Sequence, residues 1–241
     1  ATSEGTIVTP IENFVEGMCV EFYGLGDAFS CCKIKSINPM VGQIRFDASE
    51  DPGTIPQGTK VYVSGARTSG ELTGLKALFE NNTLYGLSKN RADMCPQSMT
   101  SENLTETIIQ TQIDAVEEKT GQKIDFIICS WGVKRALVEY FNSLGKTLPT
   151  IELEGGHKAL SFNGIPIVAE RFCPKGTMYL LTSECFKLYQ LCDWEWLEAE
   201  DGKILKQVSG KPVYQATLVK YAELLCDNPA AQARISGITE K

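Results

Sequence analysis

The sequence predicts an α+β fold, in which a small β-rich module precedes a larger domain of helices and strands. Three observations predict it. Residues 5–65 form short runs of β-branched and aromatic residues separated by turn residues. Residues 100–145 hold two stretches with apolar residues at helical spacing, on either side of one continuous apolar run. From residue 158 onward strand-like runs and a hairpin signal return.

The first of these regions is expected to be a β-barrel-like module covering residues 1–70. Its five expected strands are TIV, MCVEFY, CCKIKSI, QIRF and KVYVSG. The turns between them contain Gly17, Asn38-Pro39, Asp51-Pro52-Gly53 and Gly58. The stretch GARTSGELTG, residues 65–74, is rich in Gly and polar residues, which indicates a joint between domains.

A helix, a buried strand and a second helix are expected next. Thr100 or Ser101 is the expected N-cap of the first helix, and Gly121 ends it. The run IDFIICS is typical of a strand that is buried on both faces. Ser130 is the expected N-cap of the second helix, which ends at Gly145.

The remaining residues are expected to be strands. Asn163-Gly164 lies between ALSF and IPIVAE and is a strong signal for a two-residue hairpin. TMYLLT and FKLYQL follow as further strands. Residues 213–226 are expected to form one long strand of about fourteen residues, which we expect to carry sheet pairing across to another domain.

Composition and charge exclude several classes of protein. Of the 241 residues 43% are hydrophobic and 22% are charged, which is an ordinary globular balance and excludes a disordered chain. The net charge of −7 argues against affinity for bare nucleic acid, which needs clustered Lys and Arg. No apolar run approaches the length of about 20 residues that a membrane span needs, so no membrane partner is expected.

The sequence contains little that could perform catalysis. It has nine cysteines without a C-x-x-C pair, and His157 is its one histidine, so no zinc site is expected. The cysteines are expected to be free thiols that act as small hydrophobic residues. No phosphate-binding loop, nucleophile elbow or carboxylate-rich metal loop is present. We therefore expect no enzyme, no cofactor and no metal.

Two alternatives remain open. One is a cysteine-dependent hydrolase that uses His157 as its base. The other is an SH3-like barrel in residues 1–65 that binds nucleic acid, although this region has four basic against eight acidic residues.

Four segments resemble one protein family. GELTGLKALFENNTLYGL resembles its "Gly-Leu" segment, and IDFIICSWGVKRAL resembles its buried strand with the capped helix that follows. ELEGGHKALSFNGIPIVAERFCPKGTMYLL resembles its Gly-Gly loop and hairpin, and KPVYQATLVKYAELLCDNPAAQARISGIT resembles its long closing strand. The family is the major capsid proteins of tailed phages with the Hong Kong 97-type fold, which encapsulins share. The resemblance begins near Gly70 and runs to Lys241.

The resemblance implies a domain organisation and a site. Residues 71–205 would form the axial domain, and residues 206–241 would supply the long strand and the C-terminal part of the peripheral domain. The module at 1–70 would be an insertion. The loop near the capsomer axis would contain Lys146, Thr147, Leu148, Glu152, Glu154, Gly155 and Gly156.

The resemblance also implies a function. The chain would be a capsid subunit that assembles with copies of itself into hexamers and pentamers, and then into an icosahedral shell around phage DNA. DNA would be contacted only non-specifically, and a scaffold, a portal and a maturation protease are further implied partners. The protein would occupy the virion capsid, and the host cytoplasm during assembly. Nothing in residues 1–70 matches the long spine helix of the family, so the chain is expected to be a fragment of a coat protein.

Overall fold

The structure, a computed structural model, describes most of the chain. The described residues are 6–7, 11–23, 32–46, 55–64, 72–152, 156, 158–198, 202–207, 210 and 212–241. They fall into two compact units, Ala1–Glu71 and Leu72–Lys241, each with its own hydrophobic core. We call the first unit the N-terminal module.

The N-terminal module is an antiparallel sheet of five strands in the order β1-β4-β3-β2-β5. Its elements are β1 (Thr6–Ile7), η1 (Ile11–Asn13), β2 (Cys19–Tyr23), β3 (Cys32–Asn38), β4 (Gln43–Phe46) and β5 (Lys60–Val63). Each of the five strands that the residue pattern predicted is present. Alternate residues of β2, β3 and β4 point inward and are buried, because successive side chains of a strand face opposite sides. They form a core of Val20, Phe22, Cys32, Ile34, Ile44 and Phe46.

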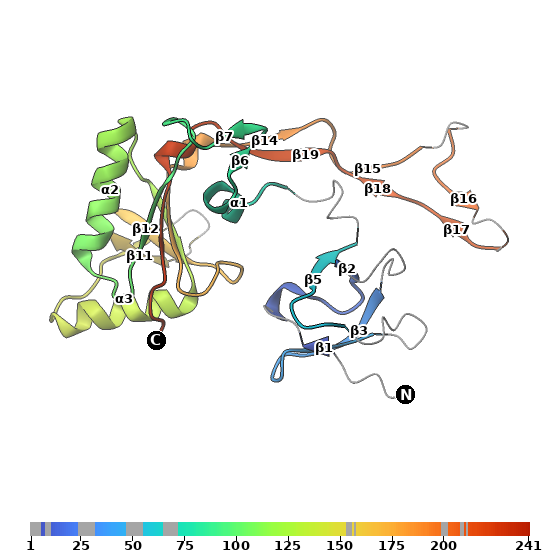
Figure 1. Cartoon of the computed structure of the whole chain (residues 1–241), viewed down its shortest axis with the longest axis horizontal. Coiled ribbons are helices and arrows are strands. Elements are labelled where there is room, and N and C mark those ends of the chain that lie inside the picture. The colour runs from blue at the N-terminus through green and yellow to red at the C-terminus, as the bar shows by residue number, and fades with distance from the viewer. Residues whose placement is uncertain are drawn as a thin grey trace. The chain divides into compact units, whose positions relative to one another are not determined.

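The second unit consists of an α/β body and a two-stranded ribbon (Figure 1). The body contains α1 (Leu75–Glu80), β6 (Thr83–Leu84), β7 (Leu87–Ser88), β8 (Gln97–Thr100), α2 (Glu106–Thr120), β9 (Phe126–Cys129), α3 (Trp131–Ser143), β10 (Thr150–Glu152), β11 (Lys158–Phe162), β12 (Ile165–Ala169), β13 (Met178–Leu181), η3 (Ser183–Cys185), η4 (Pro229–Ala231) and β20 (Ala233–Ser236). Seven of its strands form one mixed sheet in the order β10-β11-β12-β9-β13-β20-β8.

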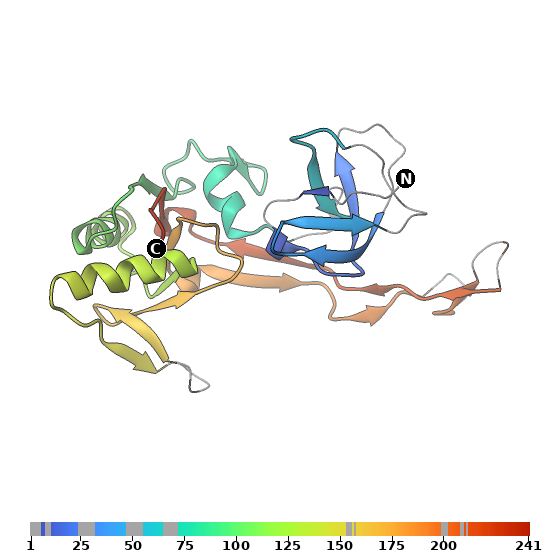
Figure 2. The same cartoon turned by 90° about the horizontal axis from the view of Figure 1, so that it is seen from below.

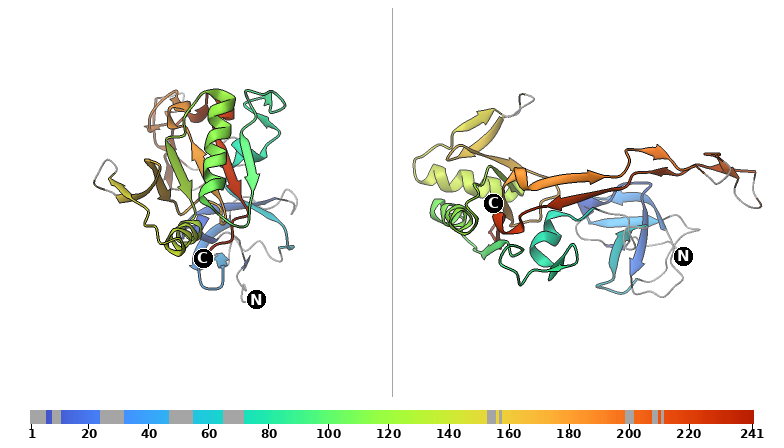
Figure 3. Two further views of the ribbon diagram at one scale, coloured as in Figure 1. Left: turned by 90° about the vertical axis from the view of Figure 1, so that its left-hand side faces the viewer. Right: turned by 90° about the horizontal axis from the view of Figure 1, so that it is seen from above.

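Strand β9 lies in the middle of this sheet, parallel to β12 on one side and antiparallel to β13 on the other. Ile127 and Cys129 are 0% exposed, and Phe126 and Ile128 on the opposite face are half-buried. The strand predicted from IDFIICS is therefore confirmed, with one face in the core and the other face partly covered. Figure 3 shows α2 in front of the strands of this sheet, and α2 packs against β20 and β8.

Helix α2 begins later than the sequence predicted. Thr105 is its N-cap, and the side-chain oxygen of Thr105 accepts a hydrogen bond from the N–H of Ile108 at 3.3 Å. The predicted caps Thr100 and Ser101 are wrong, because Thr100 is the last residue of β8 and pairs with Ser236 of β20. Gly121 ends the helix in a left-handed conformation, with φ at 69°, as predicted.

Helix α3 begins where the sequence predicted. Ser130 is its N-cap, and its hydroxyl oxygen accepts from the N–H of Val133 at 3.4 Å. Val133, Leu137 and Phe141 are buried on the face that packs into the core. The last helical residue is Ser143, and Gly145 then takes a positive φ of 68°.

The hairpin between β11 and β12 is confirmed. Asn163 has φ at 50° and Gly164 has φ at 84°, the left-handed values that a two-residue hairpin of this kind requires. Phe162 pairs with Ile165 directly next to the turn. The amide of Asn163 also donates to the side-chain oxygen of Gln110 in α2 at 2.9 Å, which ties the turn to the helix.

The described residues between 186 and 226 form a ribbon of three successive antiparallel strand pairs (Figure 2). β14 (Phe186–Gln190) pairs with β19 (Ala222–Cys226), β15 (Glu195–Trp196) with β18 (Leu218–Val219), and β16 (Lys206–Gln207) with β17 (Tyr214–Gln215). The single long strand expected at 213–226 is wrong, because it is divided into three short strands. These three strands pair with β14, β15 and β16 of the same unit, whereas pairing with another domain was expected. The expected domain boundary at residue 205 falls within the ribbon, while β20 lies inside the seven-stranded sheet.

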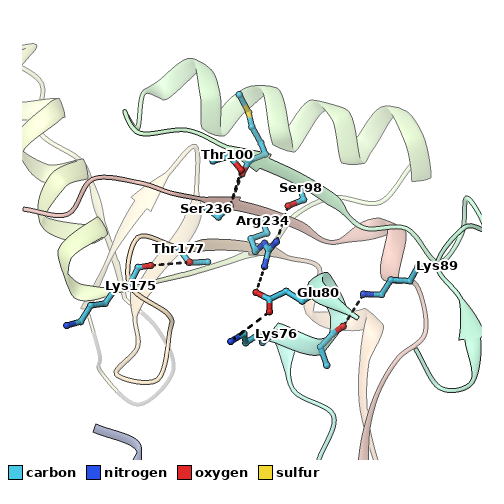
Figure 4. A network of polar contacts seen from close by, with 11 residues as sticks. Lys76, Glu80, Lys89, Ser98, Thr100, Lys175, Thr177, Arg234 and Ser236 are labelled. Atoms are coloured by element: carbon cyan, nitrogen blue, oxygen red, sulfur yellow. Dashed lines mark hydrogen bonds and ion pairs between the residues drawn. The ribbon is translucent and has the colours of Figure 1, made fainter. Parts of the chain in front are cut away.

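A polar network fixes α1 to one end of the sheet (Figure 4). Arg234 of β20 donates to Glu80 of α1 at 3.1 Å and to Ser98 of β8 at 3.4 Å. The Arg234 guanidinium carbon also lies 5.3 Å from the centre of the Phe79 ring. Only 16% of the Arg234 side chain is exposed, so these contacts are screened less than those of an exposed ion pair.

We predict that Gly164→Val lowers the free energy of unfolding by about 1 kcal/mol or more, because a β-branched residue is strained at positive φ. A Cβ atom at Gly164 would meet nothing within 4 Å, so the cost comes from the backbone and not from a clash. Urea denaturation measures it. The matched control is Gly74→Val, where φ is −84° and a Cβ atom again meets nothing within 4 Å. Equal stability of the two variants would contradict the role of the turn.

Candidate assembly surfaces

The residues of the predicted axis loop lie in the segment that runs from the end of α3 through β10 to the start of β11. Lys146 follows the end of α3, and its ammonium group lies 3.3 Å from a carboxylate oxygen of Glu106 in α2. Glu152 is the last residue of β10 and lies 3.6 Å from Lys158 at the start of β11. Lys146, Thr147 and Glu152 are exposed and available to a neighbouring molecule.

The other residues of this predicted site differ in their burial. Leu148 is only 9% exposed and belongs to the core of the body, so it anchors the loop rather than presenting a surface. Gly156 has a positive φ of 78°. Glu154 and Gly155 lie outside the described residues, as does His157.

The ribbon carries the largest group of exposed apolar side chains among the described residues. Of the 23 large hydrophobic residues that are exposed there, 12 lie between residues 188 and 221. They are Leu188, Tyr189, Leu191, Trp194, Trp196, Leu197, Ile204, Leu205, Val213, Tyr214, Leu218 and Tyr221. A two-stranded ribbon is too thin to enclose a core of its own, so these side chains face solvent in the single chain. An exposed apolar patch of this kind marks an interaction surface.

Two exposed tryptophans of the ribbon lie beside apolar and charged side chains. Trp196 pairs with Leu218 across the strands, and these side chains are 52% and 46% exposed. Lys220 lies with its ammonium group 5.9 Å from the ring centre of Trp194 and 2.8 Å from a carboxylate oxygen of Asp193. The alternation of Trp194 and Trp196 with Glu195 would fit a half-buried strand, but both tryptophan side chains are more than half exposed.

The outer face of α3 forms a third surface. A shallow groove of about 480 Å³ runs along the helix and is lined by Trp131, Lys134, Arg135, Val138, Glu139 and Asn142. Trp131 is 55% exposed, and the Lys134 ammonium group lies 5.7 Å from the centre of its ring. Two basic residues, Lys134 and Arg135, are too few to form a phosphate-binding site.

Three buried thiols in the described part of the chain are unsuited to nucleophilic catalysis. Burial raises the pKa of the thiols of Cys129, Cys173 and Cys226 to about 12, so these three are poor nucleophiles at neutral pH. The eight cysteines that the structure describes are free, and Cys31 lies outside the described residues. Within the described part of the chain no three His, Cys, Asp or Glu side chains gather in a way that could hold a metal ion. No described helix is long and apolar enough to cross a membrane.

The nucleic-acid alternative depends on the outer face of the module. Lys33 and Lys35 of β3 are exposed on the side opposite to the core, as is Arg45 of β4. Of the acidic residues of the module, Glu4, Asp27, Asp47, Glu50 and Asp51 lie outside the described residues. The charge of this face is therefore not fixed by the described residues, and the alternative stays a prediction.

This chain is similar to known proteins in structure but not in sequence. No protein-family model matches the sequence, and no curated protein sequence matches it. The capsid asymmetric unit of cyanophage A-1(L) contains a chain that matches with a TM-score of 0.51 at 18% identity, over 70% of this chain and 60% of that one. The SrpI encapsulin of Synechococcus elongatus PCC 7942 matches with a TM-score of 0.47 at 16% identity, over 59% and 53%. The chain thus spans 53% to 60% of the length of these two proteins.

We predict that buried thiols make the protein less stable in alkali. An unfolded thiol has a pKa near 8.5, whereas the pKa of folded Cys129 is about 12, so the folded state holds more protons between these values. The contribution of Cys129 to the free energy of unfolding is complete below about pH 8. It decreases as the pH rises from the unfolded toward the folded pKa, and the loss reaches roughly 1–2 kcal/mol at pH 10.

Urea denaturation of the parent and of Cys129→Ala at pH 8, 9 and 10 measures this loss. The variant starts from a lower stability because it leaves a cavity, but its stability falls less steeply with pH. Cys95→Ala, at an exposed position, is the control and keeps the slope of the parent. Identical slopes for all three proteins would contradict the assignment of Cys129 to a buried, protonated thiol.

Proposed function

Since the chain has the Hong Kong 97-type capsid fold, as its sequence segments predicted, we propose that it is the subunit of a self-assembling protein shell. The shell of the proposal is the capsid of a tailed phage or prophage, and the chain is part of its major capsid protein. The fold alone does not select a function, so the proposal depends on the surfaces of this chain.

The exposed apolar ribbon is the observation that carries the proposal. Twelve large hydrophobic side chains on a ribbon without a core of its own would favour aggregation in a protein that remained alone in solution. In a shell the same side chains are buried against neighbouring subunits. Burial of apolar surface stabilises association by about 25 cal/mol for each Å² removed from water.

The proposal assigns a role to each part of the second unit. The α/β body acts as the axial domain, and the ribbon belongs to the peripheral domain. The connection that carries Lys146, Thr147 and Glu152 lies near the axis of a capsomer, and Glu154, Gly155 and Gly156 belong to the same proposed site. Leu148, which is buried, holds this connection to the body.

The partners and the location follow from the same proposal. Copies of the chain form hexamers and pentamers, and phage DNA inside the shell is contacted only non-specifically. The net charge of −7 supports a lining to which DNA does not adhere. A scaffold, a portal and a maturation protease would act on the shell, which assembles in the host cytoplasm and ends as the virion capsid. The protein acts as a structural component and not as an enzyme.

We predict that the natural reading frame that encodes these 241 residues yields shell-sized particles or capsomers when it is expressed whole. Trp194→Ser combined with Trp196→Ser abolishes these particles, because both side chains are more than half exposed in the single chain and would be buried on assembly. Negative-stain electron microscopy and light scattering make the measurement.

The control for this experiment is Met40→Ser combined with Val41→Ser, which removes two exposed apolar residues from the N-terminal module instead. The control retains assembly if the ribbon is the principal surface. A whole protein that stays dispersed and turns over an ester or peptide substrate, with that turnover lost in His157→Ala, would instead establish the hydrolase alternative.

A second prediction concerns the axis connection. Lys146→Ala and Glu152→Ala each remove one exposed charge, so the stability of the single chain changes by no more than about 0.5 kcal/mol. Assembly of the whole protein becomes slower or yields fewer closed particles, because these side chains face the neighbours around the axis. Unchanged assembly kinetics in both variants would remove these residues from the proposed interface.

A further inference from the structure

The outer edges of β14 and β19 differ in whether their outward backbone groups are hydrogen-bonded. This difference indicates where another strand could pair. In an antiparallel pair, every second residue directs its N–H and C=O groups to the other strand, and the residues between direct theirs outward. Leu191 donates to the carbonyl of Tyr221 at 2.8 Å and Asp227 to that of Cys185 at 2.8 Å. The odd-numbered residues therefore face inward on both strands, and the even-numbered residues face outward.

The outer edge of β19 is closed by side chains. The Tyr85 hydroxyl donates to the carbonyl of Leu224 at 3.0 Å and accepts from the N–H of Cys226 at 3.1 Å. The N–H of Leu224 donates to a carboxylate oxygen of Glu223 at 3.0 Å, and the N–H of Thr73 donates to the same oxygen at 2.7 Å. Two side chains thus satisfy both outward groups of Leu224 and the outward N–H of Cys226, which an additional strand would otherwise bind.

The closure of this edge comes at a conformational cost. Tyr85 has a positive φ of 50°, an unfavourable value for a bulky residue, and it shares the turn between β6 and β7 with Gly86. Strain of this kind persists where the surrounding structure holds the residue in place. In this conformation the β6–β7 turn holds Tyr85 against β19, where its hydroxyl blocks strand addition.

The outer edge of β14 remains open. Within the described part of the chain, no group bonds to the outward N–H or C=O of Leu188 or Gln190. All residues from Lys187 to Gln190 are exposed, and β14 contains no proline and no bulge. Proteins usually protect such an edge, because it is a template for another strand.

We propose that β14 pairs in antiparallel fashion with β14 of a second copy, across a two-fold axis at Tyr189. In this register Leu188 and Gln190 of one copy exchange hydrogen bonds with Gln190 and Leu188 of the other. Four hydrogen bonds form, and the two ribbons become one four-stranded sheet. The two Tyr189 side chains face each other as a close, non-hydrogen-bonded pair.

The side chains of β14 fit a second copy as the occupant. A two-fold axis makes an antiparallel edge complementary to itself, so the strand needs no other partner. The register places Lys187 opposite Leu191 of the second copy and avoids two like charges directly opposite each other. Leu191 is 87% exposed, and Lys187 already pairs with Asp227, which leaves its methylene groups free to cover Leu191.

The interface is small. It covers parts of Leu188, Tyr189 and Leu191, which are 53%, 54% and 87% exposed, and remains well below the roughly 1,000 Å² of a stable complex. We therefore expect a weak dimer that forms with increasing concentration. The dimer does not depend on the shell proposal, since it involves one strand edge and can form before or without a shell.

Gln190→Pro and Ala222→Pro form a matched pair that tests the proposal. The two residues are cross-strand partners, each directs its N–H outward, and each follows a tyrosine. Proline is tolerated at such edge positions. Gln190→Pro removes two of the four hydrogen bonds of the dimer and raises its dissociation constant about tenfold or more in sedimentation velocity. Ala222→Pro, on the outer edge of β19, keeps the dissociation constant of the dimer within about threefold of the parent value.

A cross-link tests the register. Tyr189→Cys in a mixture of isotopically heavy and light protein, oxidised mildly with diamide, yields a 189–189 disulfide between copies that mass spectrometry detects. Lys187→Cys yields no 187–187 disulfide, because this residue lies opposite position 191. A protein that stays monomeric at several hundred micromolar, equal weakening by both proline variants, or the absence of the 189–189 link would each overturn the proposal.

Discussion

The position of β9 is the constraint on which the α/β body depends. β9 lies between β12 and β13, so its backbone groups are satisfied on both sides and its two inward side chains are fully buried. Ser130, the next residue, starts α3, and its hydroxyl donates to the carboxylate of Glu240. The same carboxylate accepts from the N–H of Gly176 at 2.8 Å. One strand end therefore fixes a helix start, a loop and the segment that follows β20.

Two glycines show how closely these parts approach each other. A Cβ atom on Gly132 would lie 2.5 Å from the side chain of Glu240, and one on Gly176 would lie 2.7 Å from the carbonyl oxygen of Ile238. The body is therefore closely packed at these two positions. The ribbon has no comparable packing, since most of its side chains are exposed. Local stability should therefore fall along the ribbon as its distance from the body increases.

The sequence predicted the elements whose signals are local. The five strands of the N-terminal module, β9 and the Asn163-Gly164 hairpin follow from side-chain alternation, an apolar run and a turn that requires positive φ. The N-cap of α2 was missed because its location depends on β20: Thr100 is polar like a cap, but Ser236 holds it in a strand. No local pattern contains that long-range pairing.

The site was predictable only in part, for a similar reason. The resemblance to capsid proteins led to the connection after α3, and Lys146 and Glu152 are exposed there, whereas Leu148 is buried. Residues 213–226, one side of the ribbon, were predicted to form one long strand because they contain no proline or glycine to indicate the interruptions. Alternation of residue types does not reveal whether a second layer covers Trp194 and Trp196.

We expect the ribbon, as an assembly surface, to be buried between subunits. Amide hydrogen exchange of the whole protein, compared between dispersed subunits and assembled particles, tests this burial most directly. We expect exchange in residues 186–226 to slow by at least tenfold on assembly, while β9 and β13, already buried, change little. Equal exchange of the ribbon in both states would contradict a role of the ribbon in assembly.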